Sequence, residues 1–272
     1  ERLESLGLAY GRRKKEIFRS WLRGCVKGIG EESFRRMPEE SEAFQAPRRD
    51  QKIWLAMIQL LRWTDIRTWE TGLMADTMEN IAFEVFGTYG QMAAVVPVDP
   101  IYFAVFLWGD REMDGETVFC QLQFINSVYQ QFMRCEMAIY IREPEEFGKI
   151  SEQWKRLETA CADNVAMAGG VYLERKREPK DRQYQTPELR KWAGLLKDGY
   201  AAAVEEEACC YLDGLSEAGT IDRKILRQFY QDFLQVAYHA AESGNSYLKE
   251  LFSTQEEFQI YLDGMHSVDQ MK

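Results

Sequence analysis

Residues 91–110 read QMAAVVPVDPIYFAVFLWGD, which is two apolar runs on either side of an Asp99-Pro100 turn. Valine, isoleucine, phenylalanine and tyrosine are frequent in both runs, and this composition is typical of paired strands. Apolar and polar residues hardly alternate in 104–108, so we expect both faces of that strand to be covered. We therefore predict a β-hairpin at the centre of a sheet, with Pro97 at a bulge, at the turn or with its nitrogen toward solvent.

The tip of this hairpin carries few groups that could do chemistry. A tip that holds a metal ion or a phosphate normally has glycines and carboxylates, because the backbone must approach the anion and oxygens must reach the cation. Residues 98–102 are instead Val-Asp-Pro-Ile-Tyr, and an Asp beside a Pro is an ordinary turn pair. We expect no catalytic residue, no metal and no cofactor.

Composition limits the class of protein and its partners. A chain of 272 residues, 46% hydrophobic and 29% charged, is long enough for one large or two ordinary globular domains. Neither a run of about 20 apolar residues nor a basic and apolar leader is found, so we expect a cytoplasmic protein without a membrane partner. The net charge of −10 argues against a nucleic-acid-binding surface on the chain itself. Because the first residue is Glu1 rather than Met, we expect a fragment of a longer polypeptide.

Cysteine and histidine do not form a recognisable site. The six cysteines are Cys25, Cys120, Cys135, Cys161, Cys209 and Cys210. Their spacing includes no C-x-x-C pair and no pattern that closes around zinc, so we interpret them as reduced core residues. The only histidines are His239 and His266, and this argues against Ser-His-Asp and Cys-His mechanisms.

Residues 1–27 have helical composition. An a/d-like stripe is formed by Leu3, Leu6, Tyr10 and Ile17. Two interpretations remain open, an amphipathic helix on its own domain and the end of a longer dimerising helix, and these four residues are the candidate interface. The basic run 12–15 is interpreted as a solvated face. Residues 1–49 are predicted to be an N-terminal signalling and dimerisation helix with a linker.

Residues 50–176 alternate between strand and helix signals. Strands are predicted at 52–63, 136–142 and 165–173, and helices at 69–89, 114–134 and 145–163, with Asp114 as an N-cap. With the hairpin, the order is β-α-β-β-α-β-α-β. We predict an α/β (α+β) domain with a mixed sheet of about five strands and helices packed on it.

Beyond residue 183 the strand signals stop. Helices are predicted from Pro187 onward, at 200–215, at 222–241 and at 254–265, so 184–272 should form an all-α bundle. Aromatic residues recur at helical spacing in 229–238. We interpret this cluster as core, with a ligand pocket as the alternative.

The element order of 52–173 resembles that of diguanylate-cyclase (GGDEF-like) domains. In that family the hairpin carries Gly-Gly-Asp-Glu-Phe and the first strand carries a metal-binding Asp. In this chain Phe103 matches the last residue of the signature, and its other four residues are replaced by Asp-Pro-Ile-Tyr at 99–102. On the first strand, the residues near the expected Asp are Gln-Leu-Leu at 59–61. Because both oxygen ligands are missing, the resemblance implies a degenerate domain.

Shorter segments resemble the central region of AraC-type two-component response regulators of Gram-positive bacteria. They are 16–24 (EIFRSWLRG), 79–82 (ENIA), 139–141 (IYI), 163–165 (DNV), 229–235 (FYQDFLQ) and 267–272 (SVDQMK). In that family a receiver domain, phosphorylated by a sensor histidine kinase, precedes this region and a helix-turn-helix DNA-binding domain follows it. The resemblance implies that DNA is contacted only through that following domain.

Two hypotheses about function follow. The first is a relay and homodimerisation region that couples a receiver to a DNA-binding domain and does no catalysis. The second is a small-molecule-sensing regulatory domain, suggested by the many aromatic residues. Four tryptophans near the predicted sheet carry this idea: Trp54, Trp63, Trp69 and Trp108. An active nucleotide cyclase is a third possibility, against which the missing glycines and carboxylates argue.

Overall fold

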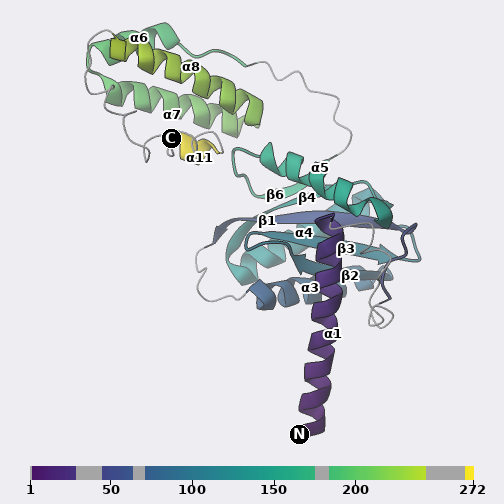
Figure 1. Ribbon diagram of the computed structural model, residues 1–272. Helices are drawn as coiled ribbons and strands as arrows, with labels where there is room; N and C mark the ends of the chain where they lie inside the picture. Colours follow the sequence, from purple (N-terminus) through teal and green to yellow (C-terminus); the bar gives the residue numbers. More distant parts are fainter. Residues whose placement is uncertain (1, 29–44, 64–70, 175–183, 243–266) are drawn as a thin grey trace. The chain divides into compact units, whose positions relative to one another are not determined.

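The computed structural model describes residues 2–28, 45–63, 71–174, 184–242 and 267–272 (Figure 1). The chain is mixed α/β and divides into two compact units. The sheet unit comprises Glu1–Cys161 and Gly169–Lys176, and the helical unit comprises Ala162–Ala168 and Arg177–Lys272. The N-terminal helix, predicted as part of a separate segment 1–49, thus belongs to the sheet unit.

The sheet has six strands in the part of the chain that is described. They are β1 (Lys52–Trp63), β2 (Gln91–Pro97), β3 (Tyr102–Gly109), β4 (Cys135–Arg142), β5 (Glu145–Glu146) and β6 (Gly170–Glu174). Their order is β2-β3-β1-β4-β6, with β5 paired to β1. The pairs are antiparallel except for β4 and β6, which run parallel, so the sheet is mixed as predicted.

The predicted hairpin is confirmed, but its predicted position at the centre of the sheet is wrong. Strands β2 and β3 pair antiparallel with Met92 opposite Trp108. The centre is β1, which pairs with β3 on one side and with β4 on the other. Strand β2 is an edge strand and ends at Pro97. This placement suits proline, which has no N–H to give to a further strand.

Helices cover both faces of the sheet. Helices α3 (Thr71–Gly87) and α4 (Gly115–Met133) contribute to one core, and α1 (Arg2–Val26) and α5 (Ile150–Ala162) contribute to the other. Strand β3 shows the consequence: Val105 enters the first core and Phe106 the second, and both are buried. The prediction that both faces of this strand are covered is confirmed.

Local signals explain where α4 begins and which side it buries. The Asp114 side chain accepts a hydrogen bond from the Thr117 N–H at 2.8 Å, as an N-cap does. Leu122 and Tyr129 are buried at helical spacing, whereas Phe132 is 70% exposed. The helix ends at Arg134, which adopts a left-handed conformation with φ of 49°.

In α3 the buried face only partly follows the apolar residues of the sequence. Leu73 is 54% exposed, whereas Met74 and Met78 are fully buried. The buried side also contains Ala75 and Ala82, whose small side chains let the helix lie close to the sheet. The helix face is therefore set by fit to β2 as well as by side-chain size.

Two predicted boundaries also differ. The strand predicted at 165–173 begins only at Gly170, because Val165 is buried in the core of the helical unit. The helix predicted from residue 145 begins at Ile150, since β5 and a 3₁₀ turn, η2 (Phe147–Lys149), precede it.

The helical unit contains α6 (Leu189–Lys197), α7 (Ala201–Glu217), α8 (Arg223–Glu242) and α11 (Val268–Met271). Its core includes Trp192 and Phe229, whose rings meet edge to face at a centroid distance of 6.2 Å. Phe229 and Tyr230 are buried, as the core interpretation of the aromatic cluster predicts, but Tyr238 is 54% exposed. The helix predicted at 254–265 lies outside the described residues. Across the described ranges, we find no helix with both the length and the apolar character required to cross a membrane.

Candidate functional site

Residues 98–102 form the hairpin corner, a turn that is closed by the side chain of Asp99. Asp99 Oδ1 accepts hydrogen bonds from the backbone N–H groups of Ile101 and Tyr102, each at 2.9 Å. The Val98 N–H donates to the Tyr102 carbonyl, also at 2.9 Å. Asp99 is thus occupied with local turn bonds, the ordinary role of Asp in a turn. The described residues contain no group of three or more His, Cys, Asp and Glu that could hold a metal ion.

Behind this corner lies a buried polar cluster that we name the corner network. It consists of Gln59, Tyr102, Tyr140 and Cys161. Tyr140 Oη donates to Gln59 Oε1 at 3.1 Å, and Cys161 Sγ approaches the same oxygen at 3.2 Å. Gln59 Nε2 reaches Tyr102 Oη at 3.5 Å. Gln59 thereby joins β1 to the hairpin, to β4 and to α5.

Burial keeps the corner network neutral. Desolvation raises the pKa of Tyr102 and also raises the pKa of Cys161. The protonated thiol of Cys161 is not a nucleophile. The arrangement can hold four elements in register, and none of its four members is a carboxylate.

A second cluster lies at the edge of the sheet, and we name it the edge clamp. It consists of Lys15, Arg19 and Arg23 on α1 and of Asp76 and Glu79 on α3. Lys15 Nζ lies 2.8 Å from Asp76 Oδ1 and 2.7 Å from Glu79 Oε1. Arg19 lies 2.9 Å from the Asp76 carboxylate and 3.1 Å from the Glu79 carboxylate. Two cations therefore face two carboxylates.

The edge clamp also bonds to the backbone of β2. Glu79 Oε2 accepts a hydrogen bond from the Val95 N–H at 2.9 Å, and Arg23 Nε donates to the Pro97 carbonyl at 2.7 Å. Since α1 and α3 cover opposite faces of the sheet, these contacts pass around the edge strand and join the two layers. Only 3% of the Arg19 side chain is exposed, so its charge depends on these partners.

The electrostatics of the edge clamp favour the ionised carboxylates. Partial burial alone would raise the pKa of Asp76, but the hydrogen bond from Lys15 and the charge of Arg19 outweigh it and lower that pKa. The clamp can therefore fix α1 on the sheet at neutral pH.

The structure tests the candidate interface residues only in part. Helix α1 is continuous over Arg2–Val26, as predicted, but the side chains of Leu3, Leu6 and Tyr10 lie outside the described residues. Ile17 is half-buried and does not belong to the edge clamp. In the basic run 12–15, Arg12 and Arg13 are exposed as expected, whereas Lys15 pairs with α3.

The cysteines are not all core residues. Cys25, Cys135 and Cys161 are buried, and burial raises the pKa of Cys25 to about 12 and that of Cys135 to about 11. Cys120 and Cys210 are exposed, so the prediction is wrong for them. His239 is exposed on α8, and His266 lies outside the described residues.

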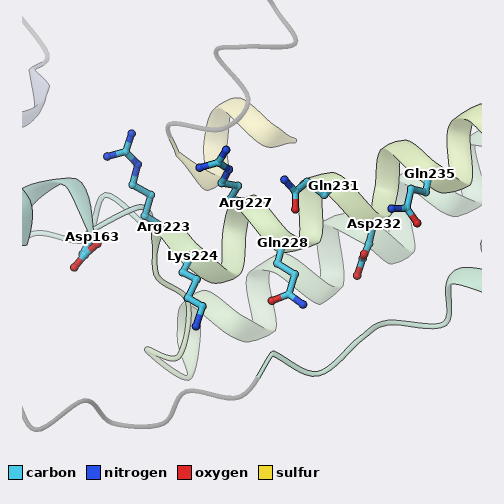
Figure 2. Close-up of a pocket in the computed structure, with 8 residues that line it drawn as sticks. All are labelled: Asp163, Arg223, Lys224, Arg227, Gln228, Gln231, Asp232 and Gln235. Carbon is cyan, nitrogen blue, oxygen red and sulfur yellow. The ribbon is translucent and has the colours of Figure 1, made fainter.

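In the helical unit, a groove of about 730 Å³ follows α8. It is lined by Asp163, Arg223, Lys224, Arg227, Gln228, Gln231, Asp232 and Gln235. Figure 2 shows Arg223 and Arg227 reaching to one side of the helix and Lys224 to the other, so the three cations do not converge. Asp222 accepts a hydrogen bond from the Ile225 N–H at 2.9 Å and thereby occupies the helix N-terminus. The groove does not form an anion site.

The chain matches no family model and no curated protein.

Proposed function

We propose that this chain is a relay and dimerisation region of an AraC-type two-component transcriptional regulator. In this proposal it couples a receiver domain to a helix-turn-helix DNA-binding domain, acts as a homodimer and catalyses no reaction. The sequence resemblance of six segments supports the family, and a degenerate GGDEF-like sheet domain is part of the proposal. The edge clamp supports the relay.

The clamp carries the argument because it makes α1 rigid with respect to the sheet. Helix α1 is a single helix of 25 residues, and its second half holds the clamp residues together with buried core residues such as Phe18 and Leu22. A rotation or shift imposed on its first half is therefore passed to β2 and α3. Such a lever suits a protein that must transmit a signal along its chain.

The sensor and enzyme alternatives have less support. Trp54 and Trp108 are 5% and 3% exposed and fill the two cores of the sheet unit. The side chain of Trp63, and Trp69, lie outside the described residues. For a cyclase, Gln59 stands near the expected Asp of the first strand, and Ile101 and Tyr102 stand where the Asp and Glu of the hairpin signature would be.

Sedimentation velocity over a concentration series tests the dimerisation part. We expect the wild-type chain to form a dimer and Leu3→Glu/Leu6→Glu to weaken it, because charge on the a/d stripe must be desolvated in a helix pair. Ser5→Glu adds charge to the same helix away from the stripe and should leave association unchanged. A wild-type chain that stays monomeric at the highest concentration would remove this part of the proposal.

Hydrogen exchange tests the relay part. We expect the Val95 amide, which donates to Glu79, to exchange at different rates in the wild-type chain and in Leu3→Glu/Leu6→Glu. Arg19→Met should reduce that difference, because it removes two of the four ion pairs that join α1 to Asp76 and Glu79 on α3 and leaves the two made by Lys15. Amides in the middle of α7, in the helical unit, serve as the internal control. Equal Val95 exchange in all chains would show that α1 does not communicate with the sheet.

A further inference from the structure

Between Glu116 and Arg134, the solvent-facing side of helix α4 carries no charge. Residues 117–133 contain no Asp, Glu, Lys or Arg. The exposed side is formed by Cys120, Gln123, Phe124, Ser127, Gln131 and Phe132. A helix on a protein surface normally places charged residues on the side that faces water. In a chain that is 29% charged, this uncharged side is an exception that needs a physical explanation.

The same side exposes large aromatic groups. Phe124 is 56% exposed and Phe132 is 70% exposed. The neighbouring helix adds Leu73 and Phe83, which are 54% and 50% exposed. Aromatic side chains and an absence of charge are the composition of the central part of protein–protein interfaces. A clustered exposed apolar surface of this kind marks an interaction site more often than isolated residues do.

The two helices form one outer layer. Tyr129 Oη on α4 donates to the Met78 carbonyl on α3 at 2.7 Å, and Gln121 Nε2 donates to Tyr89 Oη, just beyond α3, at 2.9 Å. The order of these contacts shows that the helices run antiparallel side by side. These hydrogen bonds hold the two helices to each other, so the outer side of the layer has a defined shape.

We propose that the outer side of α4 binds the same side of α4 in a second copy of this chain, about a twofold axis. The net charge of −10 makes two copies repel each other, so a stable contact between them requires a surface free of like charges. In a contact about a twofold axis, each residue meets the same residue of the other copy or a residue next to it. Phe side chains then pack on Phe side chains. Gln and Ser side chains can form hydrogen bonds with their counterparts in the other copy, because each both donates and accepts.

This contact deepens the homodimer of the proposed function, since it is a second surface separate from the stripe on α1. Substitutions test the two surfaces independently. If only the α1 substitutions weaken association, the relay proposal stands and the α4 contact is wrong. If only the α4 substitutions weaken it, the α4 contact stands and the stripe on α1 is not the interface.

Charge insertion tests the surface. We expect Phe124→Glu and Phe132→Glu each to raise the dissociation constant of the dimer about tenfold in sedimentation equilibrium, as loss of an aromatic anchor does. Tyr238→Glu is the matched control, because Tyr238 is 54% exposed on α8 and receives the same charge. Its dissociation constant should equal that of the wild type. Unchanged association in both phenylalanine variants would overturn the proposal.

Disulfide trapping tests the geometry. In a chain with Cys120, Cys209 and Cys210 replaced by alanine, Ser127→Cys should form a covalent dimer on mild oxidation, because the twofold axis brings equivalent positions near Ser127 together. Thr159→Cys, which is also exposed and lies on α5, should not. The crosslink at position 127 should persist in Leu3→Glu/Leu6→Glu at raised protein concentration. Equal crosslinking at 127 and 159, or none at 127, would show that α4 faces another partner or solvent.

Discussion

The edge clamp and the corner network are two polar clusters of the same sheet, built from opposite chemistry. The clamp joins two cations to two carboxylates where Asp76 remains 47% exposed. The network joins an amide, two phenols and a thiol around Gln59, which is only 5% exposed. Charge is retained where water and counter-charges are near, and neutral groups are used where both are excluded.

This difference shows what each cluster can contribute. An ionic cluster responds to pH and salt, because its strength depends on the protonation of carboxylates and on screening. A neutral, buried network holds its geometry over a wide pH range. The comparison supports a joint that depends on pH and salt at the edge of the sheet and a joint that is insensitive to pH at the hairpin corner.

The largest expected effect comes from removing Arg19. Arg19→Ala should lower the free energy of unfolding of the sheet unit by about 3 kcal/mol, because Glu79 and Asp76 lose a partner and the buried aliphatic stem is lost as well. Urea denaturation followed by circular dichroism measures it. Arg19→Met keeps much of the stem and should lose less. A loss under 1 kcal/mol for Arg19→Ala would mean that the clamp is a surface contact only.

A smaller effect is expected at the corner network. Gln59→Leu should cost about 2 kcal/mol, because Tyr140 and Cys161 lose their acceptor in a buried place. That loss should be the same at pH 5 and pH 7. Gln59→Glu should instead cost more at pH 7 than at pH 4, since a carboxylate is harder to bury than a carboxylic acid. Equal cost at both pH values for the Glu variant would contradict the neutral character of the network.

The smallest effect is the pH dependence of the clamp. The pKa of Asp76 is lowered in the folded chain, so its contribution is complete above the unfolded value of about 3.9 and is lost as the pH falls through the folded value. The Asp76→Asn variant should lack this pH-dependent loss of stability. The free energies of unfolding of the wild-type chain and the variant should change with pH by amounts that differ by less than about 1 kcal/mol, because solvent screens a half-exposed carboxylate. Unfolding curves from pH 5 to pH 2 measure it. Added salt should reduce the difference, and an increase would contradict the assignment.

Local signals in the sequence predicted much of the fold. The apolar run of β1, the Asp99-Pro100 turn and the Asp114 cap each act within a few residues, and each is present in the structure. Strand order was not predictable in the same way, because it depends on which strands pair across long separations. The hairpin was placed at the centre since it is the most apolar segment, yet the longer β1 occupies that position.

The polar clusters were harder to predict. Arg19 follows the buried Phe18 in an otherwise amphipathic helix, and nothing near it in the sequence indicates partners at Asp76 and Glu79. Gln59 did leave a signal, because it is the single polar residue within the apolar segment 53–61. A polar group in a strand covered on both faces must find partners, and that requirement indicates a network without naming its members.

Strand β2 has one last consequence for how copies of this chain avoid joining in the wrong way. An open edge strand is a template on which another chain can add β-structure, and this is a common start of fibrous aggregation. Along this edge, Pro97 has no N–H to offer, its carbonyl is taken by Arg23, and the Val95 N–H is taken by Glu79. Helices α1 and α3 therefore also shield this edge of the sheet against addition of further strands, and we expect a chain without α1, which frees the Pro97 carbonyl, to aggregate more readily.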